Sequence, residues 1–280
     1  MTEHVDQTEQ PSAPIGQPAP PIDPAVQAVI DHYLNIAPHL PVRLGVPPPH
    51  VTGPENAEIT RYYEQRRETG VLSRYSLFRP GSLFRMQSFE RDMLATLFRH
   101  GRTQMSTYQM LDIGCGNGAF LRRLVSWGAD PRNLAGIELV SERVAAGRRY
   151  DPSLDIREGD ARKLPFESAS FDIVFQNTVF SSIIDRRTRR QIADEMERVL
   201  RPGGLVVSYD FRVARDRRHT RPLRVAELIT LFPGFAADAR RVTLVPPLAR
   251  ALAGHSWVLC TLLELIPPLR THDLVVLTKP

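Results

Sequence analysis

The chain has 280 residues, of which 42% are hydrophobic and 24% charged, and its formal net charge is +5 at pH 7. These proportions are ordinary for a soluble globular protein, and the length allows one domain with a sizeable core plus appendages. Cys115 and Cys260 are the only cysteines, so a disulfide framework is not expected and a reducing, cytoplasmic compartment suits the chain. The eight histidines are scattered, and no metal site is predicted.

Almost all of the positive charge is arginine, because Lys163 and Lys279 are the only lysines. The arginines gather at 186–190, 212–218 and 240–241. The simplest interpretation is a solvated surface. The alternative is attraction to an acidic substrate, an anionic membrane surface or nucleic acid.

Residues 1–23 are rich in proline and glutamine and contain no lysine or arginine. They predict a disordered tail rather than a secretory signal or a mitochondrial presequence. Residues 24–101 predict a mostly helical lid or substrate-entry segment, because apolar residues from Phe84 to Phe98 recur at helical spacing before Gly101.

Residues 102–280 alternate between apolar strands and amphipathic helices. Alternation of this kind predicts an α/β fold with a parallel sheet and helices on both faces. The expected strands are 109–113, 134–140, 154–158, 171–176, 205–211, 241–245 and 273–277. The expected helices are 118–127, 141–149, 185–200 and 223–232, with a helical insertion at about 247–268.

The stretch 257–269 is the most apolar part of the chain, but it is too short to span a bilayer and is interrupted by Glu264. A core helix or a homodimer contact is the simplest interpretation. Peripheral contact with a membrane surface, through residues 248–269, is the alternative.

A glycine-rich turn stands where the first of these strands, 109–113, meets the following helix. Gly114, Gly116 and Ala119 satisfy the pattern G-x-G-x-x-G/A, and Glu138 follows at the position of a ribose-binding acid. Glycines allow unusual backbone angles and let a ligand lie against bare peptide. By itself the turn fits NAD, FAD or any other adenosine-bearing cofactor.

Two further motifs indicate which adenosine-bearing cofactor binds. Asp112 directly precedes the glycines, where an acid would repel a pyrophosphate but accept the ammonium group of an amino acid. Gly159-Asp160-Ala161 follows the third strand and could offer a carboxylate and a backbone N–H to adenine.

With these motifs the chain resembles the class I S-adenosylmethionine-dependent methyltransferases, in their small-molecule branch with type 11 or type 25 domains. The matching segments are 111–118, 136–138, 159–161, 171–174 and 198–204. The resemblance implies a Rossmann-like sheet of seven strands whose final strand is antiparallel, with S-adenosyl-L-methionine as cofactor and S-adenosyl-L-homocysteine as product.

The resemblance also implies a set of cofactor-binding residues. The glycines would lie beneath the methionine and ribose, Asp112 near the amino acid, and Glu138 on the ribose hydroxyls. The full set is Asp112, Gly114, Cys115, Gly116, Gly118, Glu138, Leu139, Asp160, Ala161, Gln176, Asn177 and, from the lid, Tyr75.

Methyl transfer needs alignment and exclusion of water, and it needs a base only if the acceptor must lose a proton. Candidates are Tyr209 and Asp210, which close the fifth strand, and His219 in the loop beyond them. Thr178-Val179-Phe180 follows Asn177, without the Pro-Pro-aromatic motif of nucleic-acid amino-methyltransferases, so no nucleic-acid partner is expected.

The sequence therefore predicts methyl transfer to a small-molecule or lipid-like acceptor, at oxygen. The alternatives are N- or C-methylation of a natural product, a non-catalytic binding protein that keeps the fold, and a nicotinamide oxidoreductase.

Overall fold

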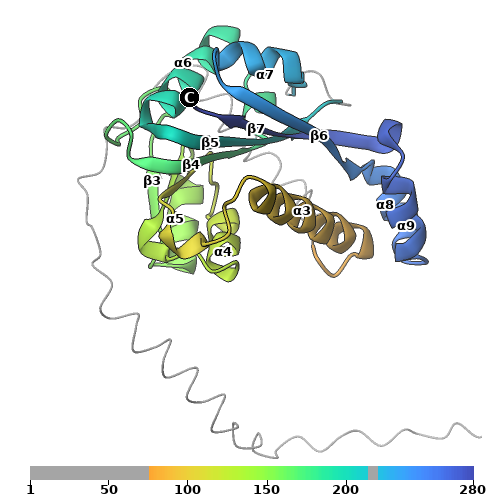
Figure 1. Ribbon diagram of the computed structural model, residues 1–280. Coiled ribbons are helices and arrows are strands. Elements are labelled where there is room, and N and C mark those ends of the chain that lie inside the picture. Colours follow the sequence, from red (N-terminus) through yellow and green to blue (C-terminus); the bar gives the residue numbers. More distant parts are fainter. Residues whose placement is uncertain (1–75, 214–219) are drawn as a thin grey trace, which may run out of the picture. The chain divides into compact units, whose positions relative to one another are not determined.

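The computed structural model describes residues 76–213 and 220–280 (Figure 1). The predictions for the tail, for most of the lid with Tyr75, and for His219 lie outside the described residues. No helix in the described ranges is long and apolar enough to cross a membrane.

Seven strands of the described residues form one sheet in the order β3-β2-β1-β4-β5-β7-β6. Neighbours from β3 to β5 pair in parallel, and β7 runs antiparallel to both β5 and β6. The predicted sheet with its antiparallel final strand is confirmed. The strands are β1 Met110–Ile113, β2 Leu134–Glu138, β3 Asp155–Glu158, β4 Phe171–Asn177, β5 Leu200–Phe211, β6 Ala236–Leu244 and β7 Arg270–Thr278.

Helices cover both faces of the sheet (Figure 1). In that view α3, α4 and α5 lie below the sheet, α6 and α7 above it, and α8 and α9 at the end that β6 borders. The helices are α3 Pro80–Arg99, α4 Ala119–Ser126, α5 Ser141–Tyr150, α6 Arg186–Val199, α7 Val225–Leu231, α8 Pro246–Leu252 and α9 Trp257–Glu264.

The core is divided by the sheet into two apolar layers. Met93 of α3, Leu121 of α4 and Phe175 of β4 belong to one layer. Met196 of α6 and Phe232, just after α7, belong to the other. The order of the strands changes direction between β1 and β4, and ligands of open α/β sheets bind outside the carboxyl ends of strands at such a point.

Several elements differ from the predictions in their extent, most clearly the insertion, β5 and β6. The predicted insertion is two helices, α8 and α9, which are separated by a turn at Gly254. β5 begins at Leu200 rather than Leu205, with a register shift opposite β4, and β6 begins at Ala236 rather than Arg241. Both strands are longer than their apolar runs because pairing with a neighbouring strand sets their length.

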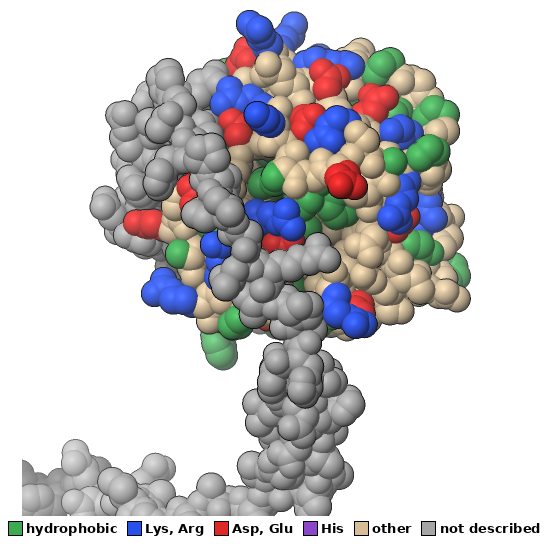
Figure 2. Space-filling model, turned by 90° about the vertical axis from the view of Figure 1, so that its left-hand side faces the viewer, with side chains coloured by type: hydrophobic (Ala, Val, Ile, Leu, Met, Phe, Trp, Pro, Cys, Tyr) green, Lys and Arg blue, Asp and Glu red, His purple; other side chains and the backbone are tan. Residues whose placement is uncertain are grey.

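Four of the clustered arginines pair with carboxylates in the part of the chain that the structure describes; they are Arg189, Arg190, Arg212 and Arg240. Figure 2 shows basic and acidic side chains interspersed on one face rather than a single basic patch. Arg190 pairs with Asp194 on α6, which fits the solvated-surface interpretation. Arg189 is an exception, since its side chain is 1% exposed and its guanidinium donates to Glu227 at 2.8 Å.

Candidate active site

The glycine turn follows β1, whose four residues are all buried. Gly114, Gly116 and Gly118 have φ angles of +66°, +61° and +75°, a region that side chains other than glycine disfavour. A Cβ atom on Gly114 would lie 2.6 Å from Val179 Cγ2, and one on Gly118 would lie 2.6 Å from Ile156 Cδ1. The turn is therefore a backbone cradle with no room for side chains.

Glu138 is the last residue of β2, and its side chain contacts the backbone of the glycine turn. Its carboxylate accepts hydrogen bonds from Gly116 N at 2.9 Å and from Val140 N at 3.0 Å, and it pairs with Arg143 Nη1 at 3.1 Å. Glu138 is 4% exposed, whereas the Arg143 side chain is 35% exposed. A ligand hydroxyl can therefore take the place of the partly exposed guanidinium on a carboxylate that the backbone already orients.

Asp112 and Asn177 lie on the other side of the cradle. Asp112 is 2% exposed, and its Oδ1 accepts from Asn177 Nδ2 at 3.4 Å. Burial raises the pKa of Asp112 to about 8, because the surroundings disfavour its charged form. Asn177 Oδ1 is buried and has no hydrogen-bond partner among the described residues. A buried carboxyl beside an orphaned amide oxygen suits a cationic donor such as an ammonium group.

The other predicted cofactor-binding residues are Asp160, Ala161, Cys115 and Leu139, and their contacts assign them no specific role. Asp160 follows β3, and its Oδ2 accepts from Arg162 Nε at 2.8 Å, while Ala161 packs against the core. Cys115 is buried, which raises the pKa of its thiol, and Leu139 is half-buried beside Glu138. These positions agree with a binding edge but leave the individual roles as predictions.

Gln176 lies on the opposite face of β4 from Asn177, because successive side chains of a strand alternate. Its Oε1 accepts from Val179 N at 3.0 Å and Phe180 N at 3.3 Å, and its Nε2 bonds Ser208 Oγ. The structure therefore does not bring its amide into the cradle. Gln176 instead holds the turn into the 3-10 helix η5, Phe180–Ser182.

Tyr209 and Asp210 likewise point to opposite faces of β5. Asp210 accepts from Ser181 N at 3.1 Å and Phe211 N at 2.8 Å, and burial raises its pKa to about 6. Tyr209 pairs in register with Asn177 and lies on the same face. The two predicted catalytic candidates thus do not converge on one point, and Tyr209 is the one that shares the face of Asp112.

Tyr209 belongs to a cluster that the sequence analysis missed. Its hydroxyl lies 2.8 Å from Thr243 Oγ1, and its ring stacks on His272 with centroids 4.6 Å apart and meets Phe89 of α3 edge-on. Burial raises the pKa of Tyr209 to about 12. Only the antiparallel pairing of β7 with β5 brings His272 here, so its distance in sequence concealed it.

Arg85 of α3 is the charged member of this cluster. Its Nε is buried and unpartnered among the described residues. Burial, and then the nearby Arg85 charge, lower the pKa of His272 to about 3, so the imidazole is neutral at pH 7. The helical spacing between Arg85 and Phe89 was the one sequence signal that could have placed both over Tyr209.

No group of three acidic, histidine or cysteine side chains in ranges 76–213 and 220–280 could hold a metal ion. The polar groups at this edge instead form a row, Asp112, Asn177, Tyr209 and His272, on the face that α3 covers. One end of the row suits an ammonium group, and the other is aromatic.

Comparison with known proteins finds a family model that matches part of the chain. Residues 111–208 match the family model described as a methyltransferase domain. The phthiotriol/phenolphthiotriol dimycocerosates methyltransferase 1 of Mycobacterium ulcerans is 36% identical over 120 residues, which are 40% of this chain and 41% of that protein. The 27-O-demethylrifamycin SV methyltransferase of Amycolatopsis mediterranei is 35% identical over 109 residues, 37% of this chain and 38% of that protein. The chain spans less than half the length of these curated relatives.

Among solved structures, the chain is similar to phosphoethanolamine N-methyltransferase 2 of Haemonchus contortus in complex with S-adenosyl-L-methionine. The TM-score is 0.50 at 19% sequence identity, over 68% of this chain and 52% of that one. At this identity the likeness shows a shared fold.

Proposed function

We propose that this chain, whose residues 111–208 form a class I methyltransferase domain, transfers a methyl group from S-adenosylmethionine to a lipid-like or natural-product acceptor, at oxygen. The observation that carries the proposal is the pair formed by Asp112 and Asn177. A carboxyl with a pKa of about 8 and a buried amide oxygen without a partner stand beside a glycine cradle. A dinucleotide would place an anionic pyrophosphate there, whereas the methionine end of S-adenosylmethionine places an ammonium.

The residues of the cradle fit the ribose and the methionine end of the cofactor. The cradle admits a ligand against its backbone, Glu138 offers two carboxylate oxygens to ribose hydroxyls, and Asp112 with Asn177 holds the ammonium. When bound, S-adenosylmethionine supplies a methyl group activated by its sulfonium, and S-adenosylhomocysteine is the product. Arg143 has to yield its place on Glu138 for this fit.

The acceptor belongs on the aromatic half of the row, under α3. Phe89, Tyr209 and His272 supply an aromatic wall, in which His272 stacks on Tyr209 and Phe89 meets Tyr209 edge-on, and the nearby Arg85 has a buried Nε without a hydrogen-bond partner among the described residues. An aromatic or otherwise apolar acceptor with an electron-rich oxygen suits this wall. The names of the two curated relatives, which refer to phthiotriol dimycocerosates and to a rifamycin, point to the same class of acceptor.

The described residues on this face offer no strong base at pH 7. The pKa of Tyr209 is about 12 and that of His272 about 3, while Asp210 faces the other side of β5. Catalysis therefore rests on holding the acceptor oxygen in line and on excluding water. We accordingly expect a hydroxyl that ionises readily, such as a phenol or an enol, to react faster than an alkyl alcohol.

Two measurements test the proposal. Titration calorimetry of the full chain should show binding of S-adenosylmethionine and S-adenosylhomocysteine but not of NAD. Phenolic and alkyl-alcohol lipids should then be incubated with S-adenosylmethionine carrying a deuterated methyl group, and the methylated atom identified by mass spectrometry and NMR. Binding of NAD without S-adenosylmethionine would refute the cofactor, and label on nitrogen or carbon would refute the oxygen assignment.

A further inference from the structure

Helix α9 is apolar on both of its faces. Its inner side packs Cys260 and Leu263 against the small core that includes Phe84 and Leu244. Its outer side leaves Val258 71% exposed. A helix on the surface of a globular protein ordinarily presents polar residues outward, so this outer face lacks a partner.

The apolar surface continues beyond this one residue. We call the outer face of α9 and the turn after it the α9 patch; its large side chains are between 38% and 71% exposed. They are Trp257, Val258, Leu259, Leu262, Leu265 and Ile266. Single exposed apolar side chains are common, but six on one eight-residue helix and its turn are not, and Thr261 is the only polar residue exposed among them.

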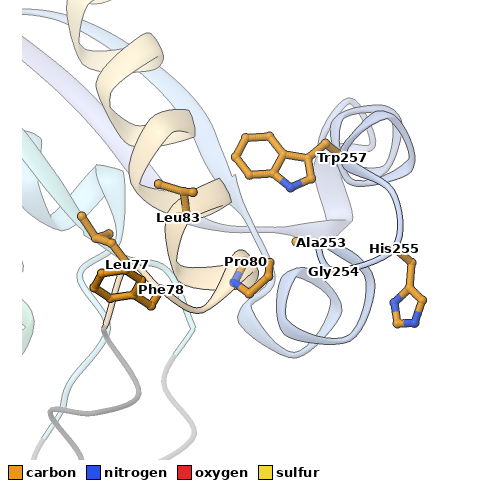
Figure 3. Close-up of a pocket in the computed structure, with 8 residues that line it drawn as sticks. All are labelled: Leu77, Phe78, Pro80, Leu83, Ala253, Gly254, His255 and Trp257. Atoms are coloured by element: carbon orange, nitrogen blue, oxygen red, sulfur yellow. The ribbon is translucent and has the colours of Figure 1, made fainter. Parts of the chain in front are cut away.

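A pocket adjoins this patch. Its volume is about 370 Å³, and it lies between the start of α3 and the turn from α8 to α9 (Figure 3). Leu77, Phe78 and Leu83 line it from one side and Trp257 from the other, with the indole ring directed toward α3. Phe78 is 100% exposed, so the apolar surface extends across the mouth of the pocket.

Within residues 245–269, the one exposed full charge is positive. Arg250 and Glu264 are the only fully charged side chains between residues 245 and 269. Arg250 is exposed, whereas Glu264 is 4% exposed and accepts from Arg91 at 2.7 Å and from Leu244 N at 3.1 Å. Arg79, just before α3, is exposed as well. The surface is therefore apolar with positive charges and no exposed carboxylate in this stretch, which complements anionic lipid headgroups.

We propose that the α9 patch and the adjoining pocket bind the surface of an anionic lipid bilayer. The helix has eight residues and lies in the plane of the interface rather than across it. Trp257 suits this boundary, because an indole ring is stable where an apolar medium meets water. The binding goes beyond the proposed methyl transfer, which does not by itself require a membrane.

The pocket and the acceptor wall both include residues of helix α3. Leu83 lines the pocket, and Phe89 on the same helix meets the ring of Tyr209. Six residues of α-helix span about 9 Å. On the proposed function, a lipid-like acceptor leaving the bilayer at the pocket would therefore reach Tyr209 along less than two turns of α3.

Vesicle flotation with the full chain tests the binding. The protein should float with phosphatidylcholine vesicles that contain phosphatidylglycerol, less with phosphatidylcholine alone, and less again as salt is added. Val258→Asp combined with Leu262→Asp should lower the bound fraction by at least about tenfold, because both side chains would enter the lipid. Phe98→Asp is the matched control: Phe98 is 72% exposed at the opposite end of α3, and its substitution should leave binding unchanged.

Tryptophan fluorescence gives a second measurement. The chain has two tryptophans, so Trp127→Phe isolates Trp257. Its emission should shift to the blue when anionic vesicles are added.

Three results would overturn the proposal. They are no flotation with anionic vesicles, flotation that the double variant does not reduce, and a homodimer that the double variant dissociates in the absence of vesicle binding. The last would assign the patch to a second copy of the chain. Calorimetry with S-adenosylmethionine on the double variant separates this proposal from the proposed function, because the cofactor should bind unchanged whether or not vesicles do.

Discussion

At the scale of single residues, Asp112 combines burial with a pKa of about 8. Without a cation beside it, Asp112 therefore holds its proton at neutral pH, and an arriving ammonium group would favour the carboxylate. Cofactor binding at about pH 6.5 should release close to one proton, since the ligand's amino group stays charged there. Calorimetry in buffers of different ionisation enthalpy measures this number.

Asp112→Asn is the variant that isolates this effect. It should remove the proton release and weaken cofactor binding. If the released proton persists in the variant, another group is its source and the ammonium is not held by Asp112.

Gly116 tests the cradle. Valine at this position would require a φ of +61° and would place its side chain against Arg143 and the ligand, so cofactor binding should fall by more than about 100-fold, which corresponds to about 3 kcal/mol. Gly101→Val is the matched control, because Gly101 has a φ of +70° but nothing within 4 Å of an added Cβ. Both variants should lose similar stability, measured by thermal unfolding, and only the first should lose cofactor binding.

At the scale of elements, Glu264 joins three parts of the fold. From α9 its carboxylate accepts from Ser88 Oγ and Arg91 of α3 and from Leu244 N of β6. Removing it would leave a buried N–H without a partner, which costs about 1–3 kcal/mol. Glu264→Ala should therefore destabilise the chain by about that amount in urea unfolding.

A surface pair provides the comparison for Glu264. Asp194 pairs with Arg190 on α6, with both side chains at least 42% exposed, and such pairs contribute about 0–1 kcal/mol. Asp194→Ala should cost clearly less than Glu264→Ala. Equal losses would mean that the buried carboxylate does not hold α9 in place.

At the scale of the whole molecule, the buried titratable groups predict how stability depends on pH. The pKa of Asp112 is raised to about 8 and that of Asp210 to about 6, so their contributions to stability are present at low pH and lost as pH rises through these values. The pKa of His272 is lowered to about 3, so its contribution is lost as pH falls below about 6.5.

Of these three groups, Asp112 makes the largest contribution to the pH dependence of the unfolding free energy between about pH 6.5 and 8. The free energy of unfolding should fall by about 1–2 kcal/mol over this interval, and Asp112→Asn should flatten the profile. Chemical denaturation at a series of pH values measures both. A profile that rises with pH over this interval would contradict the raised pKa.

The fold and the cofactor edge were predictable because their signals are local in the sequence. A buried strand, three alternating glycines and an acid at the end of the next strand lie within 30 residues, from Leu111 to Glu138. Strand boundaries were less predictable: β6 extends to Ala236 because it pairs with β7, and hydrogen bonds between strands do not appear as an apolar pattern.

The sequence by itself determined the α/β architecture and the glycine turn with an acid on either side of it, because short-range backbone and charge requirements specify both. Only the tertiary structure decided which side chains share a face. It placed Tyr209 and Asp210 on opposite sides of β5, and it brought His272 and Arg85 to Tyr209 from distant segments. It also showed that the outer face of α9 is exposed. The sequence could not show this, because a short apolar helix has the same residue pattern whether one of its faces is buried or both are.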